Sequence, residues 1–182
     1  MDNMIKKNTN DSLVKHVVDD WYEKNLRIYS RFFEDTIFFN DRQITNLNGW
    51  GNNSNPVGIV EFRNYGNLYT NLDCPVITDQ LSINNNQAKL KYPVGIMTVN
   101  EANILTNKTL MAMVSGWTMT ACSFSGSEAK IRHIPSKNVT DNYGMKPSST
   151  LSVYPVISLK PGTEYVDGDG SMADPYVLND EL

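Results

Sequence analysis

An acidic stretch near the C-terminus has residue types and a spacing that could hold a cation. From Asp167 to Ser171, side chains with oxygen alternate with glycine, as at the opening of a calcium loop. An EF-hand would also need glycine at the sixth loop position and a bidentate glutamate at the twelfth. Those positions hold Met172 and Leu178. We therefore expect no metal here and a structural turn over 167–174, with a looser calcium site as the alternative.

The two cysteines and two histidines are the other candidates for chemistry. Cys74, Cys122, His16 and His133 would form a zinc site only if all four converged, and no pair has the short spacing typical of such sites. Either cysteine could form a nucleophilic dyad with His133, but the chain has no Gly-x-Ser-x-Gly motif. We expect no cofactor and no enzymatic activity.

The irregular stretch from residue 43 to 79 is the first place to look for a ligand surface. It is rich in Asn, Gly, Pro and aromatic residues, and a long irregular segment in a compact domain is often functional. Its aromatic residues can bind a ligand or simply pack the loop against the body. The candidate ligand-binding residues are Trp50, Tyr65 and Tyr69 in this stretch and Tyr143 in a second polar loop.

A helix from Ser12 to about Leu26 should be the first element that positions these loops. Ser12 is a favourable N-cap, and apolar residues follow it at helical spacing. We expect Trp21 to anchor this helix to a sheet, with Lys15, Asp19, Asp20, Glu23 and Lys24 on the solvent side. The sequence that follows favours a short helical turn within residues 27–35.

The most regular stretch runs from Lys89 to Leu105. Apolar residues alternate with others from Leu90 to Met97, which predicts a strand with one buried face. Thr98 and Glu101 have the spacing of a capping box, so a short helix should begin at residue 99 and end near 105.

Several other segments have the composition of short strands separated by turns. Together with the helices they predict an α+β fold with a small twisted antiparallel sheet and long irregular loops. The expected strands are Thr36–Phe39, 59–62, 67–69, Gly116–Ser123, Glu128–Ile134, Leu151–Leu159 with an interruption at Pro155, and Tyr176–Leu178.

The bulk properties limit the possible partners. The chain has 182 residues and a net charge of −4, and its positive residues are scattered, so nucleic acid is not an expected partner. No apolar run approaches the roughly 20 residues that a transmembrane helix needs. We expect a flexible leader over residues 1–9 and a single domain over 10–182.

Six separated phrases carry a family resemblance. In order they are WYEKNL from Trp21, NDR from Asn40, LDCP from Leu72, YPVGIMTVNEA from Tyr92, WTMT from Trp117 and YPVISLKPGTEYVDGDGSMADPYVL from Tyr154. This set resembles an uncharacterised module of surface and prepilin-like proteins from Gram-positive gut bacteria. The resemblance implies a C-type-lectin-like fold, similar to that of formylglycine-generating enzymes, in the extracellular part of a longer exported protein.

The sequence departs from the family in ways that limit what the resemblance implies. Relatives carry cysteine directly before the Asn-Asp-Arg triplet, where this chain has Phe39, so the family disulfide to Cys74 is in doubt. The calcium-binding triplets of sugar-binding C-type lectins are absent, and Cys122 lacks the second cysteine of formylglycine-generating enzymes.

The resemblance therefore leaves three functional hypotheses. The chain is a non-enzymatic, adhesin-like module for a glycan or protein ligand, a structural subunit or stalk of a surface fibre, or, less favoured, a formylglycine-generating type of enzyme. Aromatics in a concave loop region would favour the first, and an apolar patch near the termini would favour the second.

Overall fold

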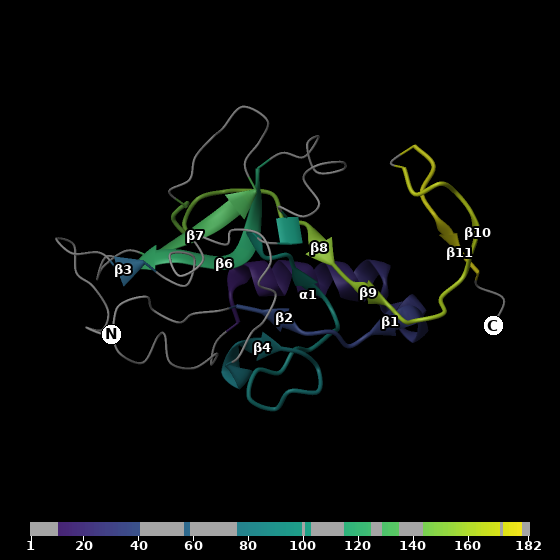
Figure 1. Cartoon of the computed structure of the whole chain (residues 1–182), viewed down its shortest axis with the longest axis horizontal. Coiled ribbons are helices and arrows are strands. Elements are labelled where there is room, and N and C mark those ends of the chain that lie inside the picture. Colours follow the sequence, from purple (N-terminus) through teal and green to yellow (C-terminus); the bar gives the residue numbers. More distant parts are fainter. Residues whose placement is uncertain are drawn as a thin grey trace.

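The computed structural model shows an α+β protein, as the sequence predicts, with helices and small antiparallel sheets (Figure 1). It describes residues 11–40, 57–58, 76–99, 101–102, 115–124, 129–134, 144–171 and 173–179. Its helices are α1 (Leu13–Asn25), the 3-10 helix η1 (Arg27–Phe32) and the 3-10 turn η3 (Ile77–Asp79).

The strands are short and pair in an antiparallel manner. Most of them are two or three residues long, and among the strands of the described residues only β6 and β7 are longer. The strands are β1 (Phe33–Glu34), β2 (Phe38–Phe39), β3 (Val57–Gly58), β4 (Gln80–Leu81), β5 (Gly95–Ile96), β6 (Gly116–Phe124), β7 (Ala129–Ile134), β8 (Pro155–Val156), β9 (Ser158–Leu159), β10 (Tyr165–Asp167) and β11 (Val177–Leu178). The pairs are β1–β9, β2–β4, β5–β8, β10–β11 and the three-stranded β3–β6–β7.

Helix α1 confirms the predicted helix and its cap. The Ser12 hydroxyl accepts a hydrogen bond from the Lys15 backbone N–H at 3.1 Å. The predicted anchor, however, is wrong: Trp21 is 37% exposed, whereas Tyr22 is 1% exposed. The helix turns by about 100° per residue, so the residues that face the sheet are Val18 and Tyr22, and Trp21 lies to one side.

The core lies where α1 and η1 pack on the paired strands. The Tyr22 ring stacks on Tyr92 with centroids 5.0 Å apart and meets the edge of Phe33 at 5.8 Å. Four of the seven buried residues of this cluster are aromatic, and aromatic rings bury large areas. The buried members of this cluster are Val18, Tyr22, Phe32, Phe33, Val94, Ile96 and Trp117.

The stretch predicted as a strand from 90 to 97 is mostly bend. Only Gly95 and Ile96 form β5, although Leu90, Val94 and Ile96 are buried as the alternation predicts. Met97 is also buried, so the alternation fails there. The chain bends over residues 91–93, where proline fits because it cannot donate to a ladder.

The predicted capping box is confirmed. The Thr98 N–H donates to Glu101 Oε2 at 2.7 Å, and the Glu101 N–H donates to Thr98 Oγ1 at 3.2 Å. Val99, Glu101 and Ala102 are helical. The rest of the predicted helix, to residue 105, lies outside the described residues.

The central strands were predicted well. Strands β6 and β7 match the predicted ranges to within a residue, and β3 adds to the outer edge of β6. Of the strand predicted over 36–39, only Phe38 and Phe39 are in a strand, β2. The strands predicted near 59–62 and 67–69 lie outside the described residues.

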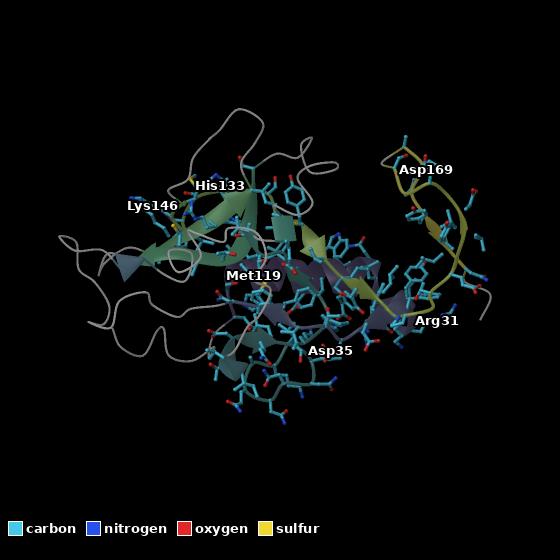
Figure 2. The ribbon with its side chains drawn as sticks, in the orientation of Figure 1. Arg31, Asp35, Met119, His133, Lys146 and Asp169 are labelled. Carbon is cyan, nitrogen blue, oxygen red and sulfur yellow. The ribbon has the colours of Figure 1, made fainter. Side chains whose placement is uncertain are left out.

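The C-terminal region differs from the prediction. The strand expected over 151–159 is two strands, and Pro155 begins β8 instead of interrupting it. Strand β11 lies within the predicted range 176–178 and pairs with β10 in a separate hairpin, while Leu178 packs against the main core cluster. This hairpin stands at one end of the molecule (Figure 1), and Asp169 lies there, far from Met119 and His133 (Figure 2).

Candidate ligand-binding site

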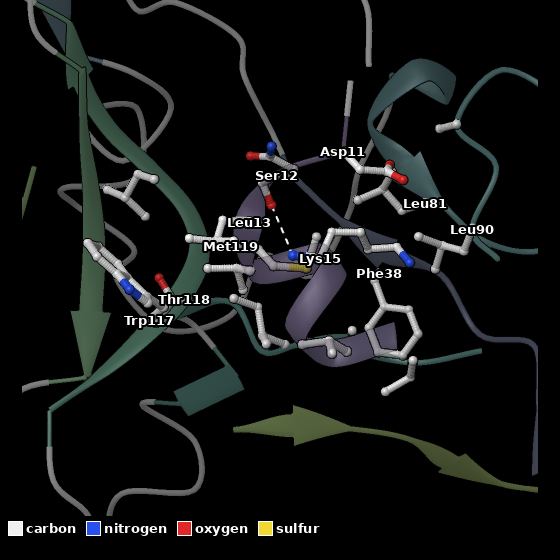
Figure 3. A pocket seen from close by; sticks show the side chains of 18 of the residues that line it. Asp11, Ser12, Leu13, Lys15, Phe38, Leu81, Leu90, Trp117, Thr118 and Met119 are labelled. Atoms are coloured by element: carbon white, nitrogen blue, oxygen red, sulfur yellow. Dashed lines mark hydrogen bonds between the residues drawn. The ribbon is translucent and has the colours of Figure 1, made fainter. Parts of the chain in front are cut away.

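A cavity of about 510 Å³ lies beside the N-terminal end of α1 (Figure 3). Its walls come from α1, β2, the loop after β4, β5 and β6. The lining residues are Asp11, Ser12, Leu13, Val14, Lys15, Val18, Phe38, Asn40, Leu81, Ala88, Lys89, Leu90, Val94, Gly95, Ile96, Trp117, Thr118, Met119, Ile131 and Pro147.

Most of the lining is apolar, with aromatic rings on two walls. Trp117 and Phe38 lie on opposite sides of the helix end in Figure 3. Gly95 lets the Phe38 ring lie against the β5 backbone, since a Cβ at Gly95 would be 2.5 Å from Phe38 Cδ1. An apolar pocket of this size with few polar groups is typical of small-ligand sites.

Lys15 and Asp19 place a charged pair beside this apolar surface. Their side chains, only 16% and 8% exposed, form an ion pair along α1. The prediction that both face solvent is therefore wrong. A buried charge needs a partner, and the i,i+4 spacing lets each residue provide one for the other.

Asn40 provides the clearest polar feature of the wall. Its backbone N–H donates to the Asp79 carbonyl at 3.0 Å, which fixes the end of β2. Its side-chain Oδ1 is buried and has no hydrogen-bond partner among the described residues. A buried acceptor without a partner costs about 1–3 kcal/mol. A ligand that donates a hydrogen bond would remove this cost.

A hydrogen-bonded loop connects the lining residue Leu81 with the lining residues Ala88, Lys89 and Leu90. The Asp35 carboxylate accepts from the Ile83 N–H at 2.9 Å and the Asn84 N–H at 3.1 Å. The Asn85 side chain donates to the carbonyls of Ile77 at 2.7 Å and Gln80 at 2.6 Å. Side-chain bonds of this kind let Asn and Asp stabilise turns, and here they fix the loop that joins these lining residues.

The structure does not test the predicted ligand-binding residues. Trp50, Tyr65, Tyr69 and Tyr143 lie outside the described residues, so their role stays a prediction. The sequence pattern did not identify Asn40 and Lys15 as wall residues. Asn40 opens the Asn-Asp-Arg phrase directly after an apolar run, which was the one signal for it.

Cys122 and His133 lie on the adjacent strands β6 and β7. The register places His133 opposite Trp117, but irregularities in β6 bring Ala121 opposite Ile131 and Ser123 opposite Lys130. Cys122 therefore lies two to three residues from His133 along β7, which is roughly 8 Å of strand. Cys74 lies outside the described residues.

The turn from Asp167 to Asp174 uses its carboxylates internally. The Asp167 carboxylate accepts from the Gly168 N–H at 2.9 Å, and the Asp169 carboxylate accepts from the Ser171 N–H at 2.8 Å. Hydrogen bonds from the backbone and hydroxyl of Ser171 lower the pKa of Asp169, so it stays ionised at neutral pH. No group of three metal-ligating side chains occurs in the described part of the chain.

We predict that this turn needs no metal. A cation that bound only the folded state would raise its stability by mass action. The thermal melt should therefore be the same in EDTA and in millimolar calcium. A rise of several degrees with calcium, abolished by Asp169→Ala, would contradict the prediction and establish a calcium site.

Comparisons with known proteins leave the family open. Within the described residues, no helix is both long enough and apolar enough to cross a membrane. No protein-family model matches the sequence, and no curated protein or solved structure is similar to it. The family resemblance therefore rests on the sequence phrases alone.

Proposed function

We propose that this chain is a non-enzymatic binding module of a bacterial surface or pilin-like protein, acting outside the cell. Its fold in this proposal is C-type-lectin-like, and its ligand is a glycan or a protein. The cavity beside α1 takes an apolar group of that ligand. The observation that carries the proposal is the apolar cavity with the unpartnered Asn40 acceptor in its wall.

The chemistry of the walls indicates what the ligand must offer. Aromatic rings such as Trp117 bind the apolar face of a sugar or an amino-acid side chain equally well. Asn40 Oδ1 needs a donor, which a sugar hydroxyl or a peptide N–H provides. The Lys15–Asp19 pair is already neutral as a unit, so no net charge is required of the ligand.

One observation favours the second candidate function, a structural subunit of a surface fibre. The C-terminal hairpin exposes four large apolar or aromatic side chains, which a contact with a neighbouring subunit would cover. They are Tyr165, Val166, Tyr176 and Val177. The third candidate, a formylglycine-generating type of enzyme, is less favoured because Cys122 lacks the second cysteine of those enzymes.

The cavity can be tested by filling it. The isolated domain is applied to an array of glycans and peptides as wild type, as Leu81→Trp and as Ile83→Trp. Leu81 lines the cavity, whereas its half-buried neighbour Ile83 does not. We expect Leu81→Trp to abolish binding and Ile83→Trp to preserve it.

A third variant separates binding from stability. Asn40→Ala removes an acceptor that has no partner among the described residues, so we expect little loss of stability. Binding should weaken about two- to tenfold, as expected for one lost hydrogen bond. Retained binding by Leu81→Trp, or no binding of the wild type to any array member, would overturn the cavity as the ligand site.

A further inference from the structure

The C-terminal hairpin is an exposed arm with an aromatic face. The rings of Tyr165 and Tyr176 lie with centroids 4.6 Å apart, yet these residues are 59% and 55% exposed. Val166 and Val177, beside them, are also exposed. Exposed single apolar residues are ordinary, but two exposed rings in contact with each other, with two exposed valines on the same hairpin, indicate an interaction surface.

The arm has an ordered tip that holds the rings in place. Gly168 and Gly170 both have positive φ values, 90° and 80°. A Cβ at Gly170 would lie 2.4 Å from the Tyr176 ring, so glycine lets that ring close over the turn. The N–H groups of Asp169 and Gly170 both donate to the Asp174 carbonyl, at 3.1 Å and 3.0 Å.

The charge of the arm has one sign. Between Pro161 and Asn179 the sequence has four carboxylates and no Lys, Arg or His. The carboxylates belong to Glu164, Asp167, Asp169 and Asp174, which are all exposed. Acidic side chains around an aromatic pair favour a cation, since ammonium and guanidinium groups bind both carboxylates and ring faces.

The strand pairing of the arm is incomplete. A two-stranded sheet leaves backbone N–H and C=O groups of each strand without a ladder partner, and an isolated hairpin is only marginally stable. Extended peptides bind such edges by adding a strand. Strand β10 is the more acidic edge, because it ends in Asp167 and follows Glu164.

We propose that β10 of this hairpin binds an extended segment of another protein in which Lys or Arg alternates with apolar residues. The segment adds a strand beside β10, and its cations contact the Tyr165–Tyr176 pair and the surrounding carboxylates. A second copy of this hairpin is a poor occupant, because two acidic arms repel each other. This inference rests on the hairpin alone and is independent of the cavity.

The test uses a capped hexapeptide of alternating lysine and valine. It is titrated into the ¹⁵N-labelled chain, with a peptide of alternating glutamate and valine as the control. We expect chemical-shift changes confined to residues 163–179, only with the lysine peptide, and weaker binding at high salt. Tyr165→Ser and Tyr176→Ser should each weaken binding about two- to fivefold, the range for an exposed cation–π contact.

Two further variants guard against loss of the hairpin itself. Glu164→Gln combined with Asp167→Asn keeps both tyrosines and every acceptor oxygen needed by the turn. This double variant should nevertheless bind the lysine peptide more weakly, and its binding should depend less on salt. Tyr29→Ser removes an exposed tyrosine on η1 and should change nothing. Equal binding of the glutamate peptide, no shifts in the hairpin, or self-association that Tyr176→Ser abolishes would each overturn the proposal.

Discussion

Replacing Tyr22 by alanine should destabilise the protein by about 3–5 kcal/mol, the usual cost of truncating a buried aromatic side chain. Tyr22 is packed between Tyr92 and Phe33 at the centre of the core. Trp21→Ala should cost only about 1–2 kcal/mol, because 37% of that residue already faces solvent. Denaturant melts of the two variants measure this contrast, and equal losses would contradict the assignment of Tyr22 as the anchor.

Tyr22→Phe is the matched control for the ring. The Tyr22 hydroxyl is buried and has no hydrogen-bond partner among the described residues. Removing it should therefore leave stability unchanged or raise it slightly. A loss above about 1 kcal/mol would show that the hydroxyl makes a stabilising contact.

The same residue predicts a pH dependence. Burial raises the pKa of Tyr22 above its ordinary value, because the ionised ring is poorly solvated. An unfolded tyrosine loses its proton near pH 10, so the stability from Tyr22 is complete below about pH 10. It is lost as pH rises from there through the folded pKa. Wild-type stability should fall more steeply than that of Tyr22→Phe in this alkaline range.

Sequence patterns were sufficient to predict the features that depend on interactions between residues close together in the chain. The cap at Ser12 and the box at Thr98 and Glu101 involve residues three apart, and both were predicted correctly. The buried face of α1 was harder to predict from the sequence, because Trp21 and Tyr22 are adjacent and both have large side chains. Only the position of β5 and of Phe33 decides which of them is buried.

The cavity beside α1 could not be predicted from the sequence, because it is formed by contacts between residues far apart in the chain. Asn40 and Asp79 are 39 positions apart, and their backbone bond forms only because β2 pairs with β4. In the sequence, Lys15 and Asp19 have the pattern of ordinary surface charges. Their burial comes from tertiary packing around α1, which the sequence pattern does not contain. The pairing of β11 with β10 was likewise absent from the sequence pattern, which predicted a strand over 176–178 but not its partner.

Gly144→Ala should cost about 2–5 kcal/mol, with two separable causes. Gly144 has φ of 70°, and a left-handed conformation costs a residue with a Cβ about 1–2 kcal/mol. A Cβ there would also lie 3.0 Å from both Cβ and Sγ of Cys122 and 3.2 Å from the Ile131 carbonyl. Crowding in a packed interior adds about 1–3 kcal/mol. Gly144 directly precedes Met145, which hydrogen-bonds to Ile131 in both directions, at 2.9 Å and 2.8 Å.

Gly162→Ala separates the two causes. Gly162 has a similar φ of 82°, but nothing lies within 4 Å of the position that a Cβ would take there. Its loss should be only the conformational part, about 1–2 kcal/mol. Adding Cys122→Ala to Gly144→Ala removes the crowding sulfur, so the two substitutions should cost less together than the sum of their separate effects. Equal losses at the two glycines, or strict additivity in the double variant, would show that the backbone conformation accounts for the whole effect and that Gly144 is not pressed against Cys122.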